Sequence, residues 1–138
     1  MELNTFGSVL RFALDLESRL ATFHREVAQA IGDASASRVL AELAEAGQQN
    51  KRKLEQVRRQ QVNEMLLEPI RGVDAAKYEL DLASHAGEEA ALVAARRAEG
   101  MAEGFYHDMA RLLSIPEAAR SFARMAETHA RNRQKLSD

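Results

Sequence analysis

The sequence of 138 residues has no cysteine, two prolines and seven glycines. Without cysteine there can be no disulfide, thiolate nucleophile, cysteine-ligated zinc or iron–sulfur cluster. The longest apolar run, from Ala90 to Ala95, is far too short to cross a bilayer, so we expect no membrane partner. The net charge of −2 gives no strong field, and we expect no nucleic-acid partner either.

Alanine, leucine, glutamate and arginine dominate the composition, and these residues favour helices. β-Branched residues are few, and the alternating apolar pattern of a strand is absent. The N-terminal stretch has an early acidic residue and no basic start, so we expect it not to be a signal peptide. A cytoplasmic location is compatible with the lack of cysteine, and we expect the protein there.

Four stretches carry apolar residues at steps of three and four, which is the spacing of a helix with one buried face. They cover about 5–31, 36–66, 87–113 and 116–135. Gly32 is expected to end the first helix, and the candidate caps of the second are Asp33, Ser35 and Ser37. Pro69 with Gly72 is expected to end the second helix.

These stretches predict an all-α fold, an antiparallel four-helix bundle in a single domain over 1–138. It is built from two helical hairpins, at about 5–66 and 87–137. The residues at 67–86 form a longer connection between the hairpins.

The second hairpin repeats the first at a shift of 82 residues. Residues 17–54 lie on 99–136 without a gap, and eleven of these 38 positions are identical. Shared helical composition explains the alanine and leucine matches. It explains less well the pairs Glu17/Glu99, Phe23/Phe105 and Asn50/Asn132. We therefore interpret the halves as an internal repeat related by a pseudo-twofold axis.

Motifs in both halves resemble those of the ferritin-like superfamily, in its rubrerythrin-type branch, over about 9–66 and 87–136. The motifs are Glu17…Phe23-His24, Glu99-x-x-Ala102-x-x-Phe105-Tyr106, Leu43-Ala44…Leu54 and Met125-Ala126…Leu136. The resemblance implies a bundle in which two helices each give one Glu and the other two each give Glu-x-x-His to two metals. It also implies oxygen or peroxide chemistry, or iron oxidation, at that centre.

The chain departs from this family pattern at four ligand positions. Gly47 and His129 stand at the two Glu places, and Asn50 and Asn132 stand at the two His places. Glycine has no ligand atom, and an asparagine amide is a weaker ligand for iron than imidazole is. We therefore expect a degenerate di-iron site that no longer holds two metals.

Two interpretations of the remaining residues stay open. In one, Glu17, Glu99 and His129 hold a single Fe, Mn or Zn ion in an oxidoreductase that acts on oxygen or peroxide. In the other, they form a buried, metal-free cluster, because a buried Glu must be paired or protonated. The residues expected around either centre are Asn132, Asn50 and His24. We favour the metal-free cluster, in a non-catalytic protein with a structural or partner-binding role.

Several other features of the sequence are weaker signals of function. Glu103 and His107 have the spacing of a surface chelate, but a solvated face is the better interpretation. The basic stretch Lys51-Arg52-Lys53, with Arg58-Arg59, is expected to be an exposed, salt-bridged face. Tyr106 and the phenylalanines fall at core positions and are expected to pack there. His85 is assigned no role. A homodimer that buries one face of the bundle is expected.

Overall fold

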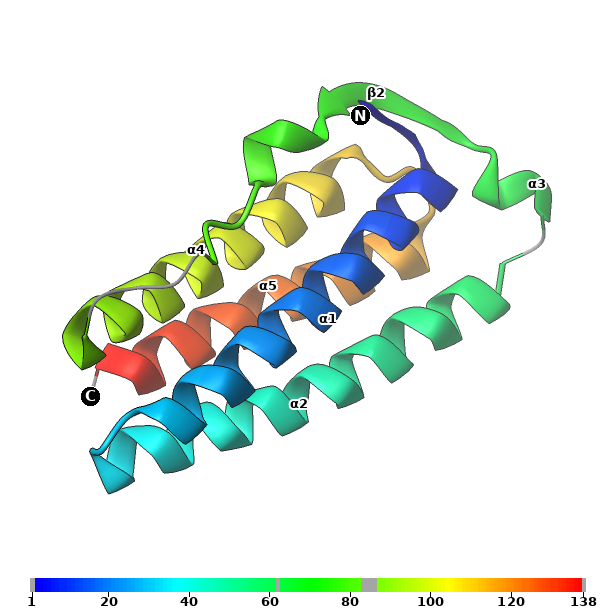
Figure 1. Ribbon diagram of the computed structural model, residues 1–138. Coiled ribbons are helices and arrows are strands. Elements are labelled where there is room, and N and C mark those ends of the chain that lie inside the picture. Colours follow the sequence, from blue (N-terminus) through cyan, green and yellow to red (C-terminus); the bar gives the residue numbers. More distant parts are fainter. Residues whose placement is uncertain (1, 62, 83–86, 138) are drawn as a thin grey trace.

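The computed structural model describes residues 2–61, 63–82 and 87–137. Four long helices lie side by side (Figure 1), and the described structure is almost entirely helical, so the all-α class is confirmed. The long helices are α1 (Phe6–Ala30), α2 (Ala34–Arg59), α4 (Glu88–Leu112) and α5 (Pro116–Ser137). Helices α1 and α2 pack as one antiparallel hairpin, and α4 and α5 as a second.

Side-chain caps fix where the first two helices begin. Thr5 accepts a hydrogen bond from the Ser8 amide at 3.1 Å, and the Ser8 hydroxyl accepts one from the Thr5 amide at 3.1 Å. This reciprocal pair satisfies two amides at the start of α1. Asp33, one of the three candidate caps, caps α2 by accepting from the Ala36 amide at 3.0 Å.

The second long helix is shorter than the sequence predicted, and a separate short helix follows it. Helix α2 ends at Arg59, not near residue 66, and the short helix α3 (Asn63–Leu66) follows it. The apolar stripe of α2 stops at Val57, and four polar residues, from Arg58 to Gln61, come next. The helix therefore has no further apolar face to bury.

A small two-stranded sheet was not predicted. Strand β1 (Glu2–Thr5) pairs antiparallel with β2 (Pro69–Asp74), with Leu3 opposite Val73. The pairing register shifts between Leu3 and Thr5, which breaks the alternation that a strand prediction needs. Because β2 contains Pro69 and Gly72, which we expected to mark only the end of a helix, its sequence does not resemble an ordinary strand.

The connection carries the chain from one end of the bundle to the other. After β2 it continues through the 3₁₀ helix η1 (Ala75–Tyr78) and returns to the end at which α4 begins (Figure 1). Consequently α2 and α4 run in the same direction, whereas α1 lies antiparallel to α4 and α2 antiparallel to α5. The bundle thus has one long crossover.

The connection also covers the line along which α1 meets α4. The Tyr78 ring lies 6.5 Å from that of Phe12 on α1 and 5.2 Å from that of Phe105 on α4. Its hydroxyl donates to Asp108 at 2.7 Å. Further along the connection, Leu80 is buried. One of the two contact lines between the hairpins is therefore covered by the chain itself.

The buried interior is apolar except near the middle of the helices. Two clusters of apolar side chains make up the core. Six buried polar or charged residues accompany them: Glu17, His24, Asn50, Glu99, His129 and Asn132. Among the described residues, none of the helices has both the length and the apolar character needed to cross a membrane.

Candidate functional site

The buried polar residues form one cluster to which every long helix contributes. Glu17 and His24 come from α1, Asn50 from α2, Glu99 from α4, and His129 with Asn132 from α5. Each is 5% exposed or less. The structure therefore brings together all the site residues that the sequence singled out. We call this set, with Tyr106, the polar cluster.

His129 lies between the two glutamates and contacts both. Its Nε2 is 2.7 Å from Glu17 Oε2, and its Nδ1 is 2.5 Å from Glu99 Oε2. An ionised carboxylate can only accept hydrogen bonds, so both ring nitrogens must carry a hydrogen. His129 is thus an imidazolium that joins two carboxylates from different hairpins.

Each glutamate has two further donors, arranged alike in the two halves. Glu17 accepts from Asn50 Nδ2 at 3.1 Å and from the Tyr106 hydroxyl at 2.6 Å. Glu99 is bonded to Asn132 Nδ2 at 3.5 Å and to His24 Nε2 at 2.8 Å. Under the shift of 82 residues, Asn50 matches Asn132 and His24 matches Tyr106. The hydrogen bonds therefore follow the internal repeat.

The charged groups of the cluster shift one another's pKa values. Burial alone would lower the pKa of His129, but the charges of Glu17 and Glu99 raise it to about 10. Burial alone would raise the pKa of Glu99, but its contacts with His129 and His24 lower it to about 2. At neutral pH the cluster therefore contains a charged His129 and an ionised Glu99.

Tyr106 has a larger role than its core spacing predicted. Besides bonding Glu17, its ring stacks on that of His129, with centroids 5.4 Å apart and an interplanar angle of 5°. Burial, followed by the charge of Glu17, raises the pKa of Tyr106 well above its ordinary value. The hydroxyl stays protonated and donates. Its match to His24 under the repeat was the signal that could have placed it in the cluster.

The site is asymmetric at Gly47, which is the counterpart of His129. A Cβ atom added at Gly47 would lie 2.9 Å from the Cβ of Ala21, closer than carbon atoms pack. Helices α1 and α2 therefore approach each other at a point where any side chain would intrude. The space that a Glu at this position would need is closed.

These residues do not fit a two-metal centre of the ferritin-like kind. One of its four carboxylate places is closed at Gly47, and another holds His129, whose two nitrogens are both engaged by carboxylates. Within residues 2–61, 63–82 and 87–137, no group of three or more His, Asp or Glu side chains is arranged to hold a metal ion. One buried atom, His24 Nδ1, has no hydrogen-bond partner among the described residues.

The weaker sequence candidates lie away from the cluster. Glu103 pairs with Arg133 at 2.9 Å rather than with His107, which is exposed. The solvated interpretation of this pair therefore agrees with the structure. His85 lies outside the described residues.

The basic stretch on α2 was expected to be salt-bridged, and this expectation is wrong for the part of the chain that the structure describes. Lys51, Arg52, Lys53, Arg58 and Arg59 form no ion pair with a described carboxylate. Apart from Lys51, which is half-buried, these side chains are exposed.

Comparisons of the chain with protein families, curated proteins and solved structures find no match.

Proposed function

We propose that this protein is a ferritin-like bundle of rubrerythrin type whose di-iron centre has been replaced by a metal-free ionic cluster. It acts as a structural or partner-binding protein and not as an oxidoreductase. The single long crossover between two hairpins, with one buried glutamate in the first helix of each, supports the ferritin-like part of the proposal.

One observation carries the functional part of the proposal. The His129 ring occupies the space between the two carboxylates, within 2.7 Å of both. It supplies one positive charge at a place where a metal would otherwise neutralise them. Asn50 and His24 bond the two oxygens that His129 does not contact. Tyr106 and Asn132 bond the same oxygens as His129. All four carboxylate oxygens therefore have a hydrogen-bond partner without an ion.

A second candidate function retains one metal ion. In it, Glu17, Glu99 and His129 hold a single Fe, Mn or Zn ion that reacts with oxygen or peroxide. The observation that favours it is His24 Nδ1, a buried nitrogen with no partner among the described residues. This candidate requires His129 to lose a proton and turn one nitrogen away from its carboxylate, against a pKa of about 10.

Metal content separates the two candidates. The purified protein is incubated without oxygen with Fe(II), Mn(II) or Zn(II), desalted, and measured by mass spectrometry, beside the variants His129→Ala and His107→Ala. The metal-free proposal expects no retained ion in any of the three proteins. Retention of about one ion per chain that is lost only in His129→Ala would overturn it and support the mononuclear site.

Thermal unfolding gives a second readout of the same question. The metal-free proposal expects the same unfolding midpoint with a strong chelator and with added Zn(II), because a ligand that binds only the native state would raise this midpoint.

A homodimer, which we retain as part of the proposal, is tested by light scattering on the protein as it elutes from a sizing column. A monomeric mass at micromolar concentration would contradict it.

A further inference from the structure

The two contact lines between the hairpins are covered differently. Along the α1–α4 line, Tyr78 and Leu80 of the connection provide apolar cover. Along the α2–α5 line a groove of about 480 Å³ remains. Its lining residues come from α2, the adjoining Gln60, and α5. No described residue of another element covers it.

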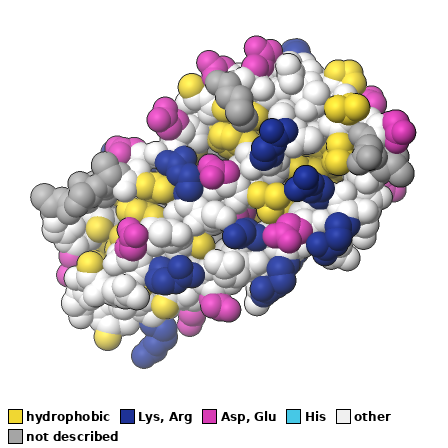
Figure 2. Space-filling view, turned by 45° about the vertical axis from the view of Figure 1, so that its right-hand side comes forward, with side chains coloured by type: hydrophobic (Ala, Val, Ile, Leu, Met, Phe, Trp, Pro, Cys, Tyr) yellow, Lys and Arg dark blue, Asp and Glu magenta, His cyan; other side chains and the backbone are white. Residues whose placement is uncertain are grey.

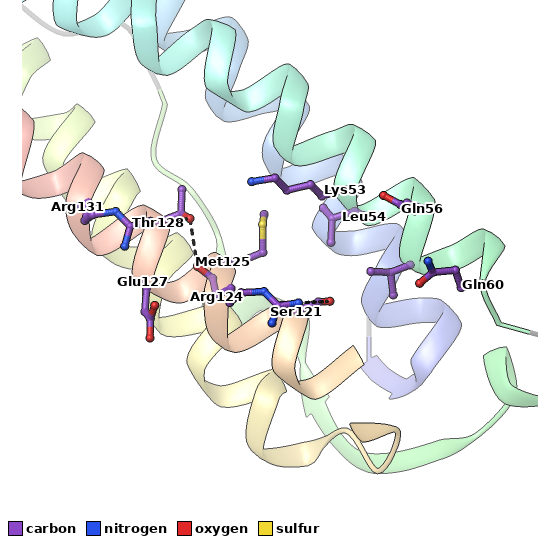
Figure 3. A pocket seen from close by; sticks show the side chains of 11 residues that line it. Lys53, Leu54, Gln56, Gln60, Ser121, Arg124, Met125, Glu127, Thr128 and Arg131 are labelled. Atoms are coloured by element: carbon purple, nitrogen blue, oxygen red, sulfur yellow. Dashed lines mark hydrogen bonds between the residues drawn. The ribbon is translucent and has the colours of Figure 1, made fainter. Parts of the chain in front are cut away.

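The floor and the walls of this groove differ in character. The buried apolar side chains of Leu54, Val57 and Met125 form the floor. Figure 3 shows that Met125 points into the space between the helices. The volume lies in the range of small-molecule sites, which are typically concave and largely apolar with a few polar groups.

Three cations, Lys53, Arg124 and Arg131, stand at the walls. All three are exposed, and Lys53 extends from α2 toward α5 (Figure 3). None forms an ion pair with a carboxylate in the described part of the chain. The only acidic residue among those lining the groove is Glu127. The walls therefore carry an excess of positive charge.

The two arginines are placed to remain available to a ligand. Arg124 donates to the Ser121 hydroxyl and Arg131 to the Thr128 hydroxyl, each at a long 3.4 Å. These contacts are long and exposed and their acceptors are uncharged, so a charged acceptor would replace them favourably. On the face of the molecule drawn in Figure 2, Lys and Arg side chains are interspersed with acidic and apolar side chains.

We propose that the α2–α5 groove binds a small amphipathic anion, a molecule with an apolar body and a carboxylate or phosphate head. The body lies on Leu54, Val57 and Met125, and the head meets cations of the walls, which are drawn from Lys53, Arg124 and Arg131. This site is separate from the polar cluster and does not depend on whether the cluster holds a metal.

Calorimetric titration of the full chain tests the proposal. The probes are octanoate and octyl phosphate, which distinguish the two head groups, together with acetate and 1-octanol, which lack the body or the charge. The proposal expects saturable 1:1 binding of at least one of the first two, and binding of acetate and 1-octanol weaker by roughly tenfold or more.

Matched variants locate the site. The triple change Lys53→Gln, Arg124→Gln, Arg131→Gln is compared with Arg25→Gln, Arg38→Gln, Lys135→Gln, which removes the same charge from exposed positions outside the groove. We expect the first triple to weaken binding by roughly tenfold or more and the second by less than about twofold. Contacts between octanoate protons and the Met125 methyl group, seen by NMR, would place the body on the floor.

Several outcomes would overturn the proposal. One is the absence of saturable binding at millimolar probe. Another is an equal loss in both triple variants, which would indicate only general charge attraction. Binding of acetate as tight as that of octanoate would show a simple anion site. Binding of an acidic peptide with no binding of octanoate or octyl phosphate would assign the groove to a protein partner. Circular dichroism of both triples confirms that each is folded.

Discussion

The two halves of the molecule share a glutamate and an asparagine at equivalent places of the cluster, but they differ at His24/Tyr106 and at Gly47/His129. Glu17 and Glu99 each accept from the Asn of their own hairpin and from a side chain of the other hairpin. Gly47 in the first half, however, corresponds to His129 in the second. His129 therefore contacts both carboxylates, while the first half has no side chain at the equivalent position.

The largest expected effect comes from removing the residue that distinguishes the halves. His129→Ala leaves two buried carboxylates facing each other, and we expect a loss of about 3–5 kcal/mol in unfolding free energy. Urea unfolding measures it. His107→Ala, an exposed change on α4, is the control and should change stability by less than about 0.5 kcal/mol.

A rescue variant keeps this prediction testable if His129→Ala does not fold. Glu17→Gln and Glu99→Gln combined with His129→Leu remove all three charges together. We expect this variant to recover most of the lost stability, because neutral partners carry a smaller desolvation cost than unpaired charges. A triple variant as unstable as His129→Ala would show that shape, and not charge, holds the cluster.

The pH dependence should be the next largest effect. The pKa of His129 is raised to about 10 from 6.5, so its contribution is fully present below pH 6.5 and is lost as pH rises toward 10. The pKa of Glu99 is lowered to about 2 from 4.5, so its contribution is present above pH 4.5 and is lost as pH falls toward 2. Stability measured across this range should be highest between pH 4.5 and 6.5.

The alkaline decline should depend on the cluster histidine. In the neutral rescue variant it should be absent, and in His107→Ala it should be unchanged. A decline of equal size in all three proteins would assign it to groups elsewhere in the chain.

A moderate effect should follow from adding a side chain at Gly47, the counterpart of His129 in the first half. Gly47→Ala places a Cβ atom 2.9 Å from that of Ala21, and we expect a loss of about 1–3 kcal/mol. The control is Gly104→Ala on α4, where an added Cβ meets nothing within 4 Å. It should stabilise by about 0.5–1 kcal/mol through helix propensity. Equal effects at the two sites would show that α1 and α2 can separate.

The smallest effect compares the two asparagines. Asn50 lies 3.1 Å from Glu17, whereas Asn132 lies 3.5 Å from Glu99. We expect Asn50→Ala to cost about 1–2 kcal/mol and Asn132→Ala less, because hydrogen bonds weaken with distance. Thermal unfolding of the two variants measures the order, and the reverse order would contradict the geometry.

Much of the fold could be predicted because it depends on local periodicity. The apolar stripes of the four long helices and the cap at Asp33 can be read from the sequence itself. The pairing of β1 with β2 could not, because it depends on contacts between residues far apart in the chain, and the shift between Leu3 and Thr5 hides the strand pattern. The end of α2 was predicted too late, although its apolar stripe stops at Val57.

The repeat predicted those residues of the candidate site that are identical in the two halves. The shift of 82 residues identified Glu17 with Glu99 and Asn50 with Asn132. It did not reveal the hydrogen bond from Tyr106, because a tyrosine at core spacing looks like packing. Nor did it show that a side chain at Gly47 would meet Ala21. A close approach between two helices produces no periodic pattern in the sequence.

Three hydrogen bonds of the cluster cross between the hairpins: His129 to Glu17, His24 to Glu99, and Tyr106 to Glu17. An assembly of two identical hairpins would obey twofold symmetry and would have to supply imidazoles at the Gly47/His129 position in even numbers. It would offer either two rings or none. Joining the hairpins in one chain frees the halves to differ, and a single shared cation for two carboxylates exists only in such a chain.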